Sequence, residues 1–167
     1  MIAPNPLLLS PTHPSVFVAH GDGPHANARR ALAAVDLTPV RRKRVLLKPN
    51  VGRVASAGSG VTTHPEVVAA AIDAFREAGA EVAIGESPIM GVNVGQAFVS
   101  SGIAAVAQAR DCPLIDMDRR RFVKVPVPQG QVIQGLKLCP EVLEFDFVVS
   151  IPVMKMHMHT GVTLAVK

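Results

Sequence analysis

The sequence predicts a three-layer α/β domain, with a mainly parallel β-sheet, helices on both faces and a short antiparallel β excursion. Short apolar runs alternate with helical patterns three times, which is typical of a parallel sheet built from crossover units. The runs are apolar at nearly every position, as strands buried on both faces are. Because 49% of the 167 residues are hydrophobic, the chain can form a real core, and residues 1–167 are predicted to be a single α/β domain.

The first predicted unit is a strand at Ser15–Ala19 followed by a helix. A Gly-Asp-Gly-Pro turn separates the two, and Pro24 suits the first turn of a helix, where an amide hydrogen is not needed. Apolar side chains then recur at i, i+3, i+4 and i+7. This spacing predicts the apolar stripe of an amphipathic helix, made of Ala28, Ala31, Leu32 and Val35.

The second unit has the clearest helix signals. Its strand, Arg44–Lys48, stops at Pro49, because proline cannot donate a hydrogen bond to a sheet. After a loop rich in glycine and serine, Thr63 and Glu66 form a capping box that predicts the start of a helix. Gly79 is expected to end this helix. The helix should bury a stripe of four apolar side chains, Val68, Ala71, Ile72 and Phe75.

The third unit begins with a strand at Glu81–Gly85. Asn93 and Gln96 predict the start of another helix by the same capping pattern. Gly102 is expected to interrupt that helix before it resumes at residues 103–108.

Further strands complete the predicted sheet and its excursion. Pro113–Asp116 is a short strand, and Phe145–Ile151 is a buried one that comes last. Between them, residues 122–127 and 132–138 alternate at period two on either side of a Gln-Gly turn. That pattern predicts the antiparallel excursion.

Charge and aromatic content argue against a nucleic-acid-binding protein. The net charge is +4, and much of it comes from two basic runs, residues 41–44 and 119–121. The chain has neither Tyr nor Trp, so the stacking contacts of single-strand binders could come only from six Phe. We interpret the basic runs as solvated charge beside buried strands and expect no nucleic acid partner. A homo-oligomer is a possible assembly that the sequence does not decide.

Composition also predicts a cytoplasmic protein without a membrane partner. No apolar run approaches the roughly 20 residues that span a bilayer, and no basic segment precedes the short Leu7–Leu9 patch. Cys112 and Cys139 are far apart and neither lies in a Cys-x-x-Cys pattern, so we expect no disulfide framework and no iron–sulfur cluster in this chain.

Polar residues follow several predicted strands at their carboxyl ends. Ligands of open parallel sheets bind beyond this edge, because loops and helix N-termini converge there. Lysine charge and the amides of a helix start suit a phosphate or carboxylate, whereas the chain has no P-loop and no Gly-x-Gly-x-x-Gly motif. The sequence therefore predicts that an anionic small molecule or cofactor is bound by Lys48, Asn50, Thr63, Glu86 and Ser87. Taken singly, Lys48 and Asn50 are also typical of ordinary turns.

The segment Met154–His159 carries the remaining candidates. Lys155 and His157 are predicted to be catalytic, the lysine as a charge stabiliser and the histidine as a proton carrier. His157 and His159 point the same way if the backbone is extended, so they are also predicted to hold a divalent metal, with Glu86 as a candidate third ligand. The alternative is a polar loop with methionine packed beneath it.

Six sequence blocks form a set with a recognisable order and spacing. They are Leu47–Asn50, Val61–Val68, Ala78–Ala80, Gly85–Pro88, Ser101–Ile103 and Phe147–His157. The set resembles the prokaryotic family called domain of unknown function 362, from about Val45 to the last residue. In that family the final block usually has a lysine and a histidine, then Thr-Gly-Val-Thr and a Lys-Asn pair. Lys155, His157, residues 160–163 and Lys167 match it here.

The resemblance implies functional roles for Lys48, Asn50, Lys155 and His157, because they lie in the matching blocks. Many family members resemble iron–sulfur proteins through a ferredoxin-like cysteine cluster after this domain, and this chain has no such cysteines. The chain is expected to be the N-terminal part of a longer family domain, or a member without the usual second half. Two alternatives to anion binding stay open, a redox or metal-handling accessory protein related to iron–sulfur proteins and a truncated inactive domain. Enzymatic activity is also left open.

Overall fold

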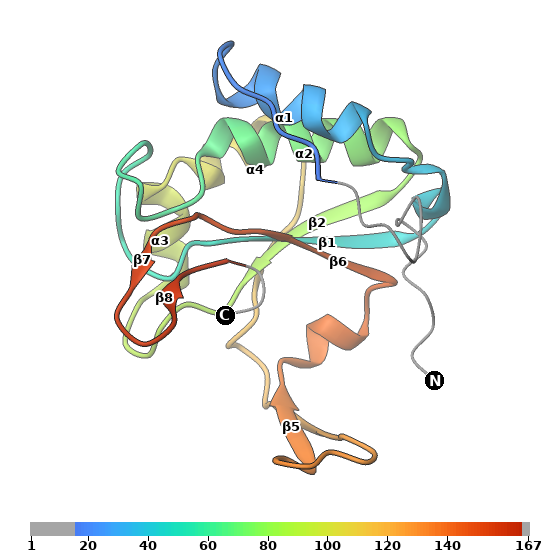
Figure 1. The fold of residues 1–167 in the computed structure, drawn as a ribbon, viewed down its shortest axis with the longest axis vertical. Coiled ribbons are helices and arrows are strands. Elements are labelled where there is room, and N and C mark those ends of the chain that lie inside the picture. The colour runs from blue at the N-terminus through green and yellow to red at the C-terminus, as the bar shows by residue number, and fades with distance from the viewer. Residues whose placement is uncertain (1–15, 165–167) are drawn as a thin grey trace.

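Four strands form the central sheet of the computed structural model, which describes residues 16–164 (Figure 1). They are β1 (Arg44–Pro49), β2 (Glu81–Glu86), β3 (Leu114–Asp116) and β6 (Phe147–Ile151). Their order across the sheet is β3-β2-β1-β6, and every neighbouring pair is parallel. Val45 of β1 lies beside Val82 on one side and beside Phe147 on the other. The predicted mainly parallel sheet is confirmed.

Four α-helices accompany the sheet in the described part of the chain. They are α1 (Pro24–Ala33), α2 (Pro65–Glu77), α3 (Val94–Ser100) and α4 (Ile103–Ala109), and the 3-10 turn η1 (Thr38–Val40) follows α1. In Figure 1, α1, α2 and α4 lie on one side of the sheet. The chain crosses the sheet in one direction from β1 to β2 to β3, so right-handed crossovers place both connections on the same face. Within residues 16–164 the α-helical layer therefore covers one face of the sheet rather than both.

Two antiparallel hairpins supplement the sheet. They are β4 (Val123–Pro126) with β5 (Gly135–Leu138), and β7 (Met156–His157) with β8 (Gly161–Val162). The first confirms the predicted antiparallel excursion. Together with the 3-10 turn η2 (Pro140–Leu143), it lies on the side of the sheet opposite α1 and α2 (Figure 1). The second hairpin was not predicted, and it follows β6 directly.

The predicted first strand at residues 15–19 is wrong. Residues 16–20 form neither strand nor helix, and Val16 and Val18 are more than four-fifths exposed. A short apolar run becomes a strand only where a neighbouring strand takes up its backbone hydrogen bonds, and no described strand pairs with this segment. Ser15 itself lies outside the described residues.

The core lies between the sheet and α2. The predicted stripe of α2 is confirmed, because Val68, Ala71, Ile72 and Phe75 are all buried against β1 and β2. On the other face, a Cβ added to Gly85 would lie 2.9 Å from both Leu46 Cδ1 and Met117 Sδ. Glycine is therefore required there for close packing.

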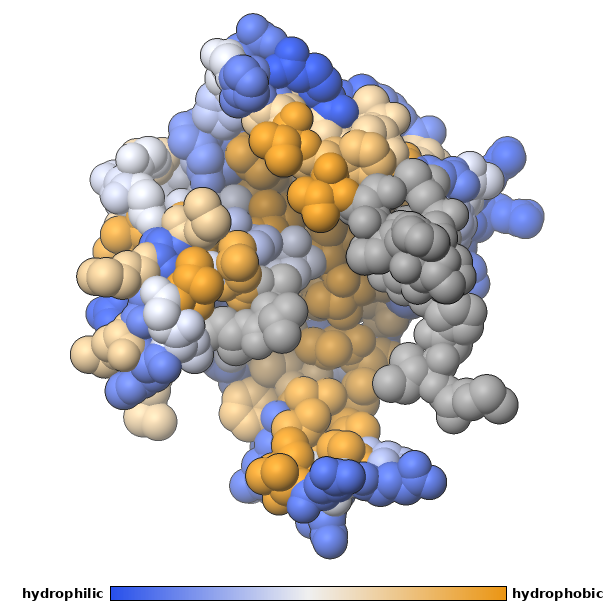
Figure 2. Space-filling view, in the orientation of Figure 1, coloured by the Kyte–Doolittle hydropathy of each residue, from blue (hydrophilic) through white to orange (hydrophobic). Residues whose placement is uncertain are grey.

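Apolar side chains also gather on the face drawn in Figure 2, in its middle below α1 and over the β4–β5 hairpin. β6 is an edge strand among the described residues, and its Val148 is 44% exposed. Leu136 of β5 and Leu143 of η2 are similarly exposed. The second face of the sheet is thus less completely covered than the helical face.

The helix ends agree with the predicted signals at three of four places. Asn93 Oδ1 accepts a hydrogen bond from Gln96 N at 2.9 Å, as predicted for the start of α3. Gly79 follows α2 with a φ of 85°, a conformation that glycine adopts without strain, and Gly102 separates α3 from α4. The predicted cap of α2 is wrong by one residue. His64 is the N-cap, and its Nδ1 accepts from Glu66 N at 3.2 Å.

Candidate functional site

A cavity of about 620 Å³ lies at the carboxyl ends of β1 and β6. These two strands end side by side, with Pro49 opposite Ile151. The cavity is lined from three parts of the chain: the end of β1 and its loop, the loop after β2, and the segment from the end of β6 to just past the β7–β8 hairpin. The lining residues are Lys48, Pro49, Asn50, Gly52, Arg53, Val61, Ile89, Ser150, Pro152, Val153, Lys155, His157, Thr163 and Leu164.

Thr63 fixes the strand ends that form the floor of this cavity. Its Oγ1 donates to Ile151 O at 2.6 Å and accepts from Asn50 N at 2.8 Å, while its own N donates to Asn50 O at 2.9 Å. The residue is 2% exposed and is not among the lining residues. This tertiary role explains why Thr63 does not cap α2, since its hydroxyl is already used between β1 and β6.

Lys155 crosses from the segment after β6 to the loop after β1. Its Nζ donates to Asn50 Oδ1 at 2.7 Å and also to Val61 O. The backbone at this position is fixed by Thr163, whose N donates to Lys155 O at 2.8 Å. Lys155 therefore joins two of the three parts of the chain that line the cavity, and it is half-buried rather than solvated.

Lys48 and Glu86 form a partly buried ion pair at the edge of the cavity. Lys48 Nζ lies 2.5 Å from Glu86 Oε1, and Glu86 is 2% exposed. The same carboxylate accepts from Val51 N at 2.8 Å and from Ser87 N at 2.9 Å. Glu86 thus neutralises one lysine and holds the start of the loop after β1, while only Lys48 of the pair lines the cavity.

Ser87 faces a different neighbourhood. Its Oγ donates to Asp118 Oδ1 at 2.6 Å, and the Cys139 thiol lies close to it. Burial raises the pKa of the Cys139 thiol above its ordinary value, which disfavours the thiolate form. Ser87 does not line the cavity.

The two candidate histidines occupy different surroundings. His157 lines the cavity, and its Nδ1 accepts from the backbone N of His159 and of Thr160, both at 3.3 Å. His159 lies in the exposed turn of the hairpin, with its ring centroid 5.8 Å from that of His157. Within residues 16–164, no group of three or more His, Cys, Asp or Glu is placed to hold a metal ion. Glu86 is engaged by Lys48 and two backbone amides, so it is not arranged as a third ligand.

The sequence did not single out two features of the cavity. Arg53, in the loop after β1, contributes a guanidinium group. Part of the lining is apolar and comes from Val61, Ile89, Pro152, Val153 and Leu164. Arg53 lies in a loop with no periodic pattern, so only its distance of three residues from Asn50 could have suggested it.

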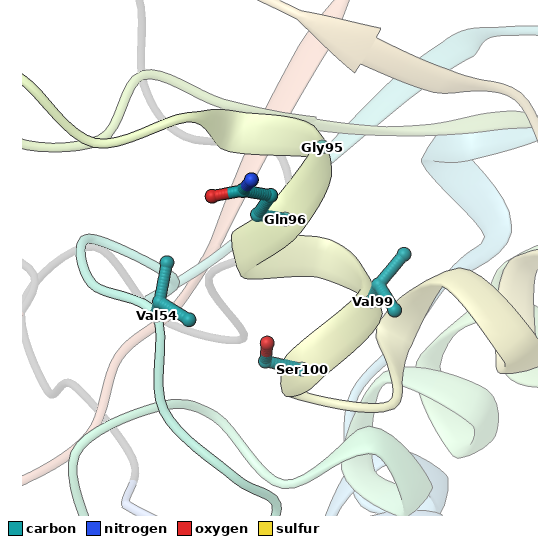
Figure 3. Close-up of a pocket in the computed structure, with 5 residues that line it drawn as sticks. All are labelled: Val54, Gly95, Gln96, Val99 and Ser100. Carbon is teal, nitrogen blue, oxygen red and sulfur yellow. The ribbon is translucent and has the colours of Figure 1, made fainter.

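A second cavity, of about 360 Å³, is chemically different. Figure 3 shows Val54 on the loop after β1 facing the side chains of Gln96, Val99 and Ser100 on α3. None of its lining residues carries a charge. It is therefore not a candidate for recognising an anion.

Comparisons with known proteins identify the family. Residues 45–167 match the domain of unknown function DUF362. The chain belongs to this family. One relative is the Thylakoid-associated protein sll1697 of Synechocystis sp., which is 33% identical to this chain over 124 residues. That match covers 74% of this chain but only 37% of the relative, so the chain spans little more than a third of that protein's length. No solved structure matches the chain.

The segment that matches DUF362 contains all the residues that line the 620 Å³ cavity. It begins at Val45, and every lining residue lies within it, whereas α1 and η1 precede it. Lys48, Asn50, Lys155 and His157, which the sequence resemblance favoured, are all lining residues. Lys167, the last residue of the resemblance, lies outside the described residues.

Replacing Thr63 with valine is expected to lower the free energy of unfolding by about 1–2 kcal/mol, because Asn50 N and Ile151 O lose a buried partner while the side-chain shape is kept. Thr63→Ser is the matched control, since serine keeps the hydroxyl. Urea denaturation of both variants measures the difference. If Thr63→Ser proves the more damaging change, the hydroxyl bridge is not what stabilises these strand ends.

Proposed function

We propose that this DUF362 domain binds a small anionic molecule in the 620 Å³ cavity at the carboxyl edge of its sheet. The observation that carries the proposal is the gathering of Lys48, Arg53, Lys155 and His157 around one cavity. Its volume lies within the range of ordinary small-molecule sites, roughly 300–1,000 Å³. Its position agrees with the general rule for ligands of open parallel sheets.

Arg53 is the cation best suited to meet the ligand. It is exposed, and within residues 16–164 it forms no ion pair, whereas Lys48 is already paired with Glu86. A guanidinium group presents its donors in a planar fork that matches a carboxylate or phosphate. The apolar residues that share the cavity favour an anion that also has an apolar part.

Catalysis belongs to the same proposal. Because His157 Nδ1 accepts hydrogen bonds from two backbone amides, the proton of its neutral imidazole is on Nε2. His157 is then a proton donor or carrier for a bound anion, and Lys155 stabilises charge beside it.

A cytoplasmic location is a further part of the proposal. Among the described helices, none has the length and apolar character needed to cross a membrane.

Arg53→Gln is expected to weaken anion binding by about 10- to 100-fold, because a hydrogen bond to a charged group contributes roughly 1.5–3 kcal/mol. The thermal midpoint of the unliganded protein should stay unchanged, since Arg53 is exposed and makes no ion pair among residues 16–164. Isothermal titration calorimetry with phosphate, acetate and benzoate measures the affinities. Benzoate tests the apolar part of the cavity against acetate.

The matched control for this prediction is Arg121→Gln, which removes another exposed arginine outside the cavity. Equal affinities for wild type and Arg53→Gln, with every probe that binds, would remove Arg53 from the proposed site. Lys155→Ala is a poorer test of the site than Arg53→Gln. Its loss also breaks the hydrogen bonds to Asn50 and Val61, so stability and binding would change together.

A further inference from the structure

The hairpin beside the cavity presents an unusual set of methionines. Three of the six methionines of the chain, Met154, Met156 and Met158, alternate with Lys155, His157 and His159. They are 76%, 91% and 87% exposed, although methionine is among the residue types most often buried. Neither the core nor the anion cavity uses these three side chains.

The backbone places Met154 and Met156 on the outer side of an alternating segment, and Met158 lies in the exposed turn that follows. Along residues 153–157, exposed and half-buried positions alternate, with the methionines exposed and Lys155 and His157 turned inward to the cavity. Successive outward positions of an extended chain are roughly 6.7 Å apart. Methionine has three rotatable bonds beyond the backbone, so neighbouring thioethers can converge on one ion.

The turn of the hairpin is fixed by hydrogen bonds. His157 Nδ1 accepts from the backbone of His159 and Thr160, and Thr160 Oγ1 donates to Val162 O at 2.9 Å. His159 follows Met158 directly in this exposed turn. An imidazole thus follows the thioethers directly in sequence, on a backbone that these hydrogen bonds fix.

We propose that Met154, Met156, Met158 and His159 form a site for a soft monovalent metal ion, Cu(I). Thioether sulfur is a soft ligand that selects Cu(I) over hard divalent cations, and imidazole also suits copper. The proposal differs from a divalent site on the two histidines, for which the described residues offer no third His, Cys, Asp or Glu ligand. It is also independent of anion binding in the neighbouring cavity.

The test is anaerobic Cu(I) titration of the full chain in competition with the chromogenic chelator bicinchoninate. The titration is made in a Cys139→Ser background, because the half-buried Cys139 thiol is another soft ligand. The test variant is Met154→Leu/Met156→Leu/Met158→Leu, which keeps apolar side chains of similar volume but removes the sulfur. The Cu(I) affinity of this triple variant is expected to fall by at least about tenfold, because leucine has no sulfur atom to bind the ion.

Controls separate the metal site from other roles of the hairpin. Met90→Leu removes a fully exposed methionine on another loop and should leave Cu(I) affinity unchanged. Thermal denaturation should show that the triple variant is folded, since the replaced side chains are exposed. X-ray absorption at the copper edge should show sulfur neighbours in the parent and fewer in the triple variant. Unchanged Cu(I) affinity in the triple variant, or tighter binding of Zn²⁺ than of Cu(I) by the parent, would overturn the proposal.

Discussion

Replacing Phe75 with alanine is expected to lower the free energy of unfolding by about 3–5 kcal/mol, the usual range for removing a buried aromatic ring from a core. Phe75 is 2% exposed and belongs to the cluster that joins α2 to β1 and β2. The truncation removes apolar contacts and leaves a cavity that close-packed neighbours fill only in part. Domains of this size typically have a free energy of unfolding of roughly 5–15 kcal/mol, so this one substitution removes a large share of the stability.

Urea denaturation monitored by circular dichroism measures the effect of Phe75→Ala. Val99→Ala is the matched control, because Val99 is a helical apolar residue that is 69% exposed, and its loss should cost less than about 0.5 kcal/mol. Phe75→Leu keeps most of the apolar volume and gives a measurable value if the alanine variant does not fold. Similar costs for Phe75→Ala and Val99→Ala would contradict a core centred on α2.

The two central strands, β1 and β2, were predicted correctly, and each has several consecutive buried residues. Val45, Leu46 and Leu47 are fully buried in β1, because strands in the middle of a parallel sheet are covered on both faces. Residues 16–19 are similarly apolar but form no strand, since a strand also requires a pairing partner and local composition does not supply one. The β7–β8 hairpin was missed because each of its strands has only two residues, too few for an alternating pattern, although Gly161 with a φ of 73° ends its turn.

The cap of α2 shows how a tertiary contact decides between two local options. Thr63 and His64 are adjacent, and each has a side chain able to accept a hydrogen bond at the start of the helix. The Thr63 hydroxyl is taken by Ile151 and Asn50, which are distant in sequence and close only in the folded sheet. His64 is therefore left to cap the helix.

The candidate site was predictable where a residue follows a strand directly. Lys48, Asn50, Lys155 and His157 come from the carboxyl ends of β1 and β6 or just beyond them, and all four line the cavity. Glu86 also ends a strand, yet its carboxylate turns to Lys48 and to the amide of Val51. The strand-end rule places residues at an edge, but it does not tell which of them pair with one another.

Replacing Glu86 with alanine is expected to lower the free energy of unfolding by about 3 kcal/mol. Removing one partner of a buried ion pair costs roughly 3–5 kcal/mol, and the lower end applies because Lys48 is 38% exposed and regains some hydration. The amides of Val51 and Ser87 lose their acceptor in the same step. We therefore expect the loop after β1, which carries Arg53, to loosen together with the fold.

Two variants separate the charge of Glu86 from its shape. Glu86→Gln keeps an oxygen acceptor for the Val51 amide but not the charge, so its cost should lie between those of wild type and Glu86→Ala. Glu77→Ala breaks an exposed pair with Arg29 and should cost at most about 1 kcal/mol. Denaturation gives these free energies, and hydrogen exchange at the Val51 amide reports the local contact. If Glu86→Ala costs no more than Glu77→Ala and that amide stays protected, Glu86 does not hold the cavity edge together.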